Sequence, residues 1–319
     1  MNNNDVLLVA EPQDESEKVG HKTTSQKTLL QIVFDSYLVL IILVIIACVS
    51  SVYYSLGLPN LYRSEAVLAP VQDKKSLGSL GSLSGLASAA GFNIGGMGVD
   101  KADLVVEVLK STEFISRFIR KHKIEAAIIA AKSWDSARQT LVYDPELYDA
   151  KTEKWLRSPT ADRGVEPSDE ELVREFRAIL VVNKDKTTDF IKVSIETLAP
   201  ELSKAWLSLL IAEINDVMRA RALNDHNQAL QSIEKSLAEN QNADVRALLF
   251  DLAGEKRKEI IVASITPNYS LTTIDSPTLP ERKSGPFRAL IVLFSLVIAF
   301  IGYMAICMIK LVRMQMKSA

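Results

Sequence analysis

Two long apolar runs frame the sequence. The one near the C-terminus extends from Ala289 to Ile309, and no charged residue lies between Arg288 and Lys310. At about 1.5 Å per helical residue, this run is long enough to cross the hydrocarbon core of a bilayer. A buried helix of a large soluble core rarely stays uncharged on every face for so long. We therefore predict a membrane-spanning helix at residues 289–309.

The other apolar run lies near the N-terminus, from Tyr37 to Tyr54. Two tyrosines end it where an aromatic belt marks the membrane interface, so we predict a first span at residues 34–55. A cleaved signal sequence has a shorter apolar core behind a short basic region. Here a long polar arm, residues 1–33, comes first, which favours an anchor. Two crossings place both termini on one side of the membrane and residues 56–288 on the other.

Basic residues indicate the orientation only in part. Those near the spans on the side of the termini are Lys22, Lys27, Lys310, Arg313 and Lys317. Three others precede the second span on the opposite side: Arg282, Lys283 and Arg288. Long domains cross the membrane largely regardless of their charge, so the short flanks of the termini carry more weight. We predict that residues 1–33 and 310–319 are cytoplasmic tails.

Between the spans, stretches of period two alternate with stretches of helical period. Alternation predicts strands at Leu61–Pro70, Leu180–Asn183, Asp189–Thr197 and Tyr269–Asp275. Helical periodicity predicts helices over residues 100–122, with a break near Ser111, and over residues 124–131. The domain is therefore predicted to be α+β.

Local signals add detail between the second helix and the second strand. Ser168, with Glu171 three residues later, forms a capping box that predicts the start of a helix. Residues 134–163 carry proline turns and no clear period, so we expect them to be irregular. Trp134 and Trp155 in this stretch are interpreted as core anchors.

The longest helical pattern starts at Pro200, and together with a returning helix that ends at Ile265 it predicts a helical hairpin over about residues 200–265. Asp244 is the expected N-cap of the returning helix. Polar residues 224–228 interrupt the apolar stripe halfway along. A helix of about 40 residues is about 60 Å long, so its outer half extends beyond a small domain. The outer stripe, which is predicted to pack in the hairpin or against another subunit, comprises Leu230, Ile233 and Leu237.

The segment before the second span contains three prolines, Pro277, Pro280 and Pro286. Proline fixes one backbone angle and withholds an amide donor, so residues 277–286 are predicted to form a stiff connector that sets the angle between domain and span. In the span itself, Gly302 and Ala305 form a small face. Such a face allows close approach by the first span, a neighbouring subunit or another membrane protein.

Composition and motifs exclude several classes of function. Hydrophobic residues make up 48% of the chain and the formal net charge is −2, so no basic excess indicates nucleic acid. Both cysteines, Cys48 and Cys307, lie in the spans, and no histidine has metal-ligand spacing. We expect no catalytic, metal or cofactor site, and therefore no enzyme. Residues 76–99 hold seven glycines without phosphate-binding spacing, and are interpreted as a loop or as an intersubunit or membrane contact.

Several stretches, taken in order, resemble the Wzz-type polysaccharide chain-length determinants, also called polysaccharide co-polymerases. The stretches are Leu61-Tyr-Arg-Ser-Glu-Ala-Val-Leu-Ala-Pro70 after the first span, Trp155-Leu-Arg157, Pro200-Glu-Leu-Ser-Lys-Ala-Trp206 with Ile214-Asn215 and Met218-Arg219 beyond it, and Ile274-Asp275 to Pro286-Phe-Arg288-Ala-Leu. One departure is Asp275-Ser-Pro-Thr, where the family commonly has Asp-Pro-Ala. The resemblance extends over about residues 30–312. No phosphate loop follows the second span, as in the kinase-free type.

The resemblance implies a non-catalytic regulator in the inner membrane of a Gram-negative cell, with both termini cytoplasmic and the main domain periplasmic. Members form rings of identical subunits and act with a Wzy-type polymerase on a lipid-linked glycan. O antigen of lipopolysaccharide is the favoured polymer, with common antigen and capsule as alternatives. The residues expected to affect assembly or glycan length are Leu230, Ile233, Leu237, Pro277, Pro280, Pro286 and Gly302.

Other classes of protein are also compatible with part of the pattern. A periplasmic adaptor or scaffold of an export or efflux complex would equally contain a helical hairpin, and is the main alternative. A sensory receptor needs a cytoplasmic signalling domain, which the residues after Lys310 are too few to form. A glycan polymerase would need many more spans.

Overall fold

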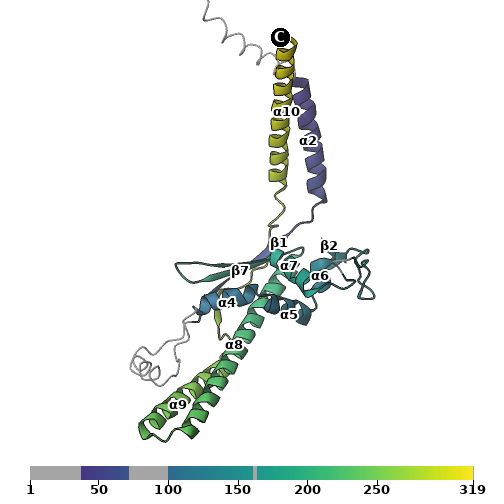
Figure 1. The fold of residues 1–319 in the computed structure, drawn as a ribbon. Coiled ribbons are helices and arrows are strands. Elements are labelled where there is room, and N and C mark those ends of the chain that lie inside the picture. Colours follow the sequence, from purple (N-terminus) through teal and green to yellow (C-terminus); the bar gives the residue numbers. More distant parts are fainter. Residues whose placement is uncertain (1–36, 72–99, 161–163, 319) are drawn as a thin grey trace, which may run out of the picture. The chain divides into compact units, whose positions relative to one another are not determined.

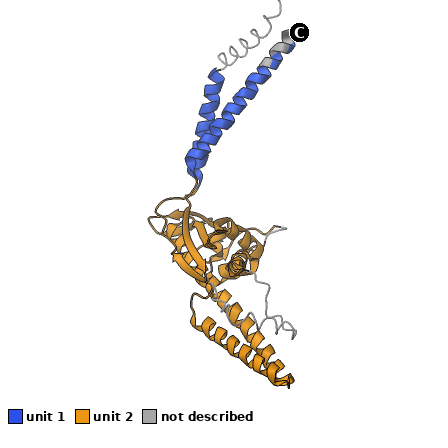
Figure 2. Ribbon diagram, turned by 90° about the vertical axis from the view of Figure 1, so that its left-hand side faces the viewer, with its two compact units in different colours: residues 1–58, 287–319 blue, residues 59–286 orange. Residues whose placement is uncertain are grey.

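A computed structural model gives the structure of residues 37–71, 100–160 and 164–318. The glycine-rich segment 76–99 and the N-terminal arm lie outside the described residues. The chain divides into two compact units (Figure 2). One contains the two terminal helices, residues 1–58 and 287–319, and is called the helix pair below. The other, Pro59–Pro286, is called the central domain.

The helix pair consists of α2 (Tyr37–Gly57) and α10 (Arg288–Ser318), which lie side by side (Figure 1). Residues Tyr37–Gly57 and Arg288–Lys310 are long and apolar enough to cross a membrane. Most of their large apolar side chains are exposed, as lipid contact requires. The buried side chains are small or polar in α2, Ser51 and Ser55, and include Tyr303 and Cys307 in α10. The predicted pair of flanking apolar helices is confirmed, and α10 continues past residue 309.

The central domain is built on a four-stranded antiparallel sheet. Its strands are β1 (Tyr62–Pro70), β6 (Leu180–Lys184), β7 (Ile191–Thr197) and β8 (Leu271–Asp275), in the order β6-β7-β1-β8. Alternate residues in the middle of β1, Ser64, Ala66 and Leu68, are buried. Ala66 and Leu68 stand opposite Val193 and Ile191 of β7. The strands that enter and leave the domain, β1 and β8, are therefore neighbours in the sheet.

Short helices and the first part of a long one close the core over this sheet. They are α4 (Lys101–Lys110), α5 (Thr112–His122), α6 (Glu125–Ile129), α7 (Asp169–Ile179) and α8 (Pro200–Glu239). The Ser111 hydroxyl caps α5 by accepting from the Phe114 amide at 3.3 Å, which explains the predicted break. The Ser168 hydroxyl likewise accepts from the Glu171 amide at 3.2 Å, so the predicted helix start is confirmed. The expected α+β class is confirmed.

The stretch predicted to be irregular contains two small antiparallel sheets instead. They are β2 (Ala131–Asp135) with β3 (Thr140–Tyr143), and β4 (Tyr148–Asp149) with β5 (Lys154–Trp155). Trp134 and Trp155 are half-buried and lie outside the main core, so their interpretation as core anchors was wrong. Trp155 packs on the ring of Tyr148 with centroids 5.1 Å apart. These strands of two to five residues are too short to show a period.

The helical hairpin is formed by the 40 residues of α8 and by α9 (Ala243–Ile265), which run alongside each other away from the sheet (Figure 1). The N-cap of α9 is Asn242, whose side-chain oxygen accepts from the Asp244 amide at 2.9 Å. The assignment of Asp244 as the N-cap was therefore wrong by two residues. Asparagine is as good a cap as aspartate, and its position immediately after the turn decides between them.

Candidate functional surfaces

The hairpin has a core of its own, separate from the core of the sheet. Its buried members are Ile233 from α8 and Leu249, Leu252 and Ala253 from α9. Leu230 and Leu237 pack against them from α8. The outer stripe predicted from the sequence thus packs within the hairpin, and its role in assembly or glycan length stays a prediction.

Between the two cores the hairpin is joined by polar side chains. Nδ1 of His226 on α8 lies 3.2 Å from a carboxylate oxygen of Glu259 on α9. The same oxygen accepts from Lys256 at 2.6 Å. This zone coincides with the polar interruption that the sequence shows at residues 224–228. The outer part of the hairpin is therefore a second packed element rather than an extension of the main core.

The other face of α9 presents apolar side chains to solvent. Phe250 and Ile261 are each 58% exposed and Ile265 is 71% exposed. Their spacing of 11 and 4 residues places them on one side of a helix. Gly254 lies between them in the sequence, and a methyl group in place of an α-hydrogen there would meet nothing within 4 Å. Large exposed apolar side chains on one helix face are typical of an interface. This face was not predicted from the sequence, because the apolar positions of α9 do not show by themselves which of them α8 buries.

The buried side chain of Asn215 on α8 bonds the hairpin to the start of β8. Its side-chain oxygen accepts from the amides of Ser270 at 3.0 Å and Leu271 at 2.9 Å. Its side-chain nitrogen donates to the carbonyl of Leu271 at 3.2 Å and to that of Ile211 at 3.2 Å. The start of β8 is therefore held directly against α8, so the direction of the long helix is coupled to the sheet.

A buried ion pair attaches the two small sheets to the rest of the domain. Both guanidinium nitrogens of Arg157 donate to the Glu171 carboxylate, at 2.7 and 2.9 Å, and the two side chains are only 5% and 10% exposed. The remaining donor of Arg157, Nε, binds the carbonyl of Val165 at 2.8 Å. Glu171 is also the third residue of α7. Both charges are satisfied, so this pair has a structural rather than a catalytic arrangement.

The proline-rich connector lies along the first half of β1, on the side where β8 pairs only with Val67–Pro70. The hydroxyl of Ser64 donates to the Thr278 carbonyl at 2.7 Å. Further along, the amides of Ser284 and Leu61 bind the carbonyls of Leu61 at 2.8 Å and Gly285 at 3.0 Å. The Ser284 hydroxyl also donates to Glu196 of β7. The connector thus continues the edge started by β8.

The predicted site residues do not converge on one place. Pro277, Pro280 and Pro286 are half-buried along the connector. Gly302 lies on α10, and a Cβ built on it meets nothing within 4 Å, so close packing of this glycine on α2 is excluded. The small face remains available to a neighbour. Among the described residues no cluster of histidine, cysteine and carboxylate side chains has the arrangement of a metal site.

These features define a class: a protein with two candidate membrane-spanning helices that flank an α+β domain bearing a helical hairpin. No family model matches the sequence, and no curated protein matches it significantly. Solved structures that are similar to it include two polysaccharide co-polymerases. One is a full-length bacterial polysaccharide co-polymerase with 11% sequence identity and a TM-score of 0.36; the match covers 90% of this chain and 97% of that one. Another is a fragment of WzzB, a polysaccharide co-polymerase from Salmonella Typhimurium, with 12% sequence identity and a TM-score of 0.30; the match covers 71% of this chain and 100% of that fragment.

Proposed function

We propose that this protein is a non-catalytic regulator of polysaccharide chain length, acting on lipopolysaccharide O antigen in the inner membrane of a Gram-negative cell. The observation that carries the proposal is the architecture: two flanking candidate spans around an α+β domain whose 40-residue helix forms a hairpin with a second core. The stretches quoted above, such as Leu61–Pro70 and Pro200–Trp206, are similar to the chain-length determinants.

Assembly into a ring of identical subunits is part of this proposal. The exposed apolar face of α9, with Phe250, Ile261 and Ile265, supports it. Removing such a face from water against a neighbouring subunit stabilises the assembly. Identical contacts repeated around a closed ring cover every copy of the face. The ring would act with a Wzy-type polymerase on a lipid-linked glycan, with both termini cytoplasmic and the central domain periplasmic.

The decisive experiment compares lipopolysaccharide from a deletion strain, its parent and the complemented strain on one gel. Loss of a modal O-antigen length in the deletion strain, restored by the gene, is the expected result. A parental profile in the deletion strain would contradict O-antigen regulation. Gels of common antigen and of capsule from the same strains would then test the other two polymers.

The helical hairpin also suits a periplasmic adaptor or scaffold of an export or efflux complex. Affinity purification of the full-length protein from crosslinked cells separates the two functions. Recovery of an outer-membrane channel would support the adaptor, whereas recovery of the polymerase supports the regulator. The experiment uses the protein with both spans, since the partners of the two candidates lie in different membranes.

A further inference from the structure

The proposed function does not account for a pair of adjacent basic residues in the connector. Arg282 and Lys283 precede the second span on the side of the central domain. In the proposed orientation this is the exported side, where basic residues next to a span work against the orientation that the tails favour. A basic pair in such a position calls for a role that offsets this disadvantage.

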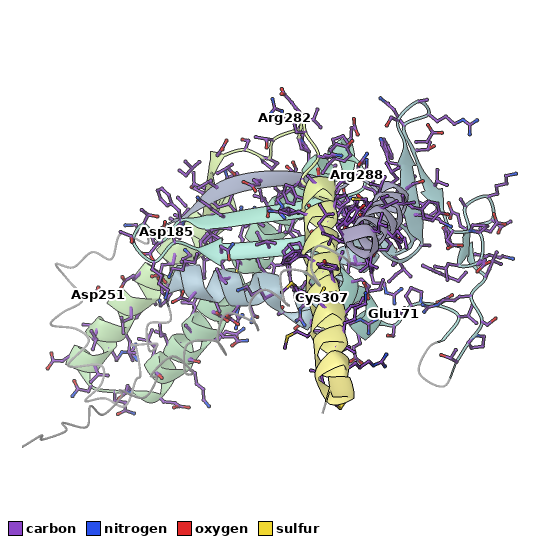
Figure 3. The ribbon with its side chains drawn as sticks, turned by 90° about the horizontal axis from the view of Figure 1, so that it is seen from above. Glu171, Asp185, Asp251, Arg282, Arg288 and Cys307 are labelled. Carbon is purple, nitrogen blue, oxygen red and sulfur yellow. The ribbon has the colours of Figure 1, made fainter. Side chains whose placement is uncertain are left out.

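The pair sits at the tip of a turn whose two ends are fixed. Before the turn, Thr278 is bound by Ser64 of β1, and after it Ser284 is bound to Leu61. Arg282 and Lys283 themselves are exposed, and neither forms an ion pair or hydrogen bond with any residue that the structure describes. Figure 3 shows Arg282 on this turn. Two basic groups are thus presented on a constrained backbone with their charge uncompensated by a bound partner.

The surroundings of the pair combine apolar and charged groups. Leu279, in the same turn, is 50% exposed, and Glu281 is the only acidic side chain between it and Ser284. An exposed leucine beside two cations is the combination found in segments that lie at the surface of a bilayer. In such segments the apolar group enters the acyl boundary while the cations stay among the headgroups.

Chain connectivity keeps this turn close to the bilayer. The candidate span begins at Arg288, five residues after Lys283. Five residues extend over at most about 18 Å, which leaves the pair within reach of the headgroup layer. The proximity follows from the covalent chain alone, so it holds whatever the angle between the domain and the span.

We propose that Arg282 and Lys283 form a binding site for the phosphate groups of anionic phospholipids in the adjoining leaflet. Each cation attracts an anionic headgroup, and because the spans already hold the turn at the surface, the contact forms at a high effective concentration of headgroups. The bound headgroups would fix the depth of the connector. The site depends only on the two spans, and it does not depend on which polymer the protein regulates.

The test offers equal amounts of phosphatidylglycerol and phosphatidylcholine to the purified full-length protein and counts the lipids retained per subunit by native mass spectrometry. The wild type is expected to prefer phosphatidylglycerol. In the double variant Arg282→Gln/Lys283→Gln, the ratio of retained phosphatidylglycerol to phosphatidylcholine should fall by about fivefold for each charge removed. Raising the salt concentration should weaken the wild-type preference in the same direction.

Two further variants control for charge and fold. Arg221→Gln/Lys258→Gln removes one arginine and one lysine that are exposed on the hairpin, and should leave the lipid preference unchanged. Lys283→Arg with Arg282→Lys keeps both charges and should keep the preference. An unchanged preference in the charge-removing double variant, or its loss in the charge-keeping one, would overturn the proposal.

A second arm replaces phosphatidylglycerol with a polyprenyl diphosphate, the kind of carrier that a lipid-linked glycan would use. If the double variant still prefers phosphatidylglycerol but no longer retains the polyprenyl diphosphate, the pair recognises the carrier and the phospholipid site is wrong. Lipopolysaccharide gels of the same variants report on chain-length regulation separately. Failure of one proposal is therefore distinguishable from failure of the other.

Discussion

At the scale of single residues, Asn215 of the central domain has four hydrogen bonds to its side chain. It is buried and uses both side-chain atoms on two elements, α8 and β8. Asn215→Ala would leave the amides of Ser270 and Leu271 without this acceptor, at a cost of about 1–3 kcal/mol for each buried group left unpaired. We expect a lower unfolding temperature by scanning fluorimetry. Asn224→Ala, an exposed position on the same helix, is the matched control, and equal melting of the two variants would contradict the role of Asn215.

Lys184 is surrounded by three carboxylates at the end of β6. Its Nζ lies 2.6 Å from Asp100, 2.8 Å from Asp103 and 3.2 Å from Asp189. The hydrogen bond from Lys184 lowers the pKa of Asp100 below its ordinary value of 3.8, and the Ala102 amide lowers this pKa further. The same contacts raise the pKa of Lys184. The cluster holds the start of α4 against the sheet.

A lowered pKa in the folded state gives a stability contribution that is complete above the unfolded value and is lost as the pH falls through the folded value. The unfolding temperature should therefore fall in acid, below about pH 4, and Asp100→Asn should make this fall shallower. Melting curves from neutral pH to acid measure it. Asp251→Asn, an exposed aspartate of α9 (Figure 3), is the control, and an identical acid profile for both variants would refute the role of the cluster.

At the scale of elements, the hairpin's own core can be tested by introducing a single charge into it. Leu230 packs against buried Leu249 and its neighbours, and Leu230→Glu places a carboxylate there. Truncating a fully buried leucine costs about 2–5 kcal/mol, and less at a half-buried site such as this one. We expect a smaller oligomer on crosslinking or a shifted glycan length. Gln231→Glu adds the same charge on the exposed face. A crosslinking ladder and a glycan profile that stay normal in Leu230→Glu would show that the stripe has no such role.

The connector leads to a different expectation, because its prolines are half-buried on an edge rather than enclosed in a core. Pro280→Ala with Pro286→Ala restores backbone freedom beside the span and should broaden or shorten the glycan distribution at a normal protein level. Pro145→Ala, in a loop of the central domain, is the control. Gly302→Leu, which has room for its side chain in the helix pair, tests the small face separately. Wild-type glycan profiles in both would exclude a regulatory role.

Some helices and strands could be assigned from the sequence and others could not. β1 alternates over nine residues and α7 has a capping box, so both could be predicted closely. β2 to β5 could not, because strands of two to five residues are too short to carry a period, and the contact that joins β4 to β5 is between the rings of Tyr148 and Trp155. The contacts of the connector depend on Ser64 and Ser284, which are polar residues far apart in sequence. The outer face of α9 became visible only when the direction of its buried face was known.

At the scale of the whole molecule, the topology is the first quantity to measure. If both candidate spans cross the membrane, Lys101 and Arg313 lie on opposite sides of it. Reporter fusions made after Lys101 and after Arg313 should therefore give opposite signals, with the enzyme that is active outside the cytoplasm working only at the first site. Equal signals at both positions would contradict two crossings. The result also decides whether Arg282 and Lys283 face the leaflet proposed above.

The bridge between Leu61 and Gly285 has a consequence for protein engineering. The chain enters the central domain at Pro59 and leaves it at Pro286, and this backbone pairing brings the two ends together before either reaches a terminal helix. A domain with adjacent ends is a natural module for grafting. We therefore expect that residues 59–286 can be inserted into a surface loop of an unrelated soluble carrier without a long spacer, which would allow the domain to be handled free of detergent.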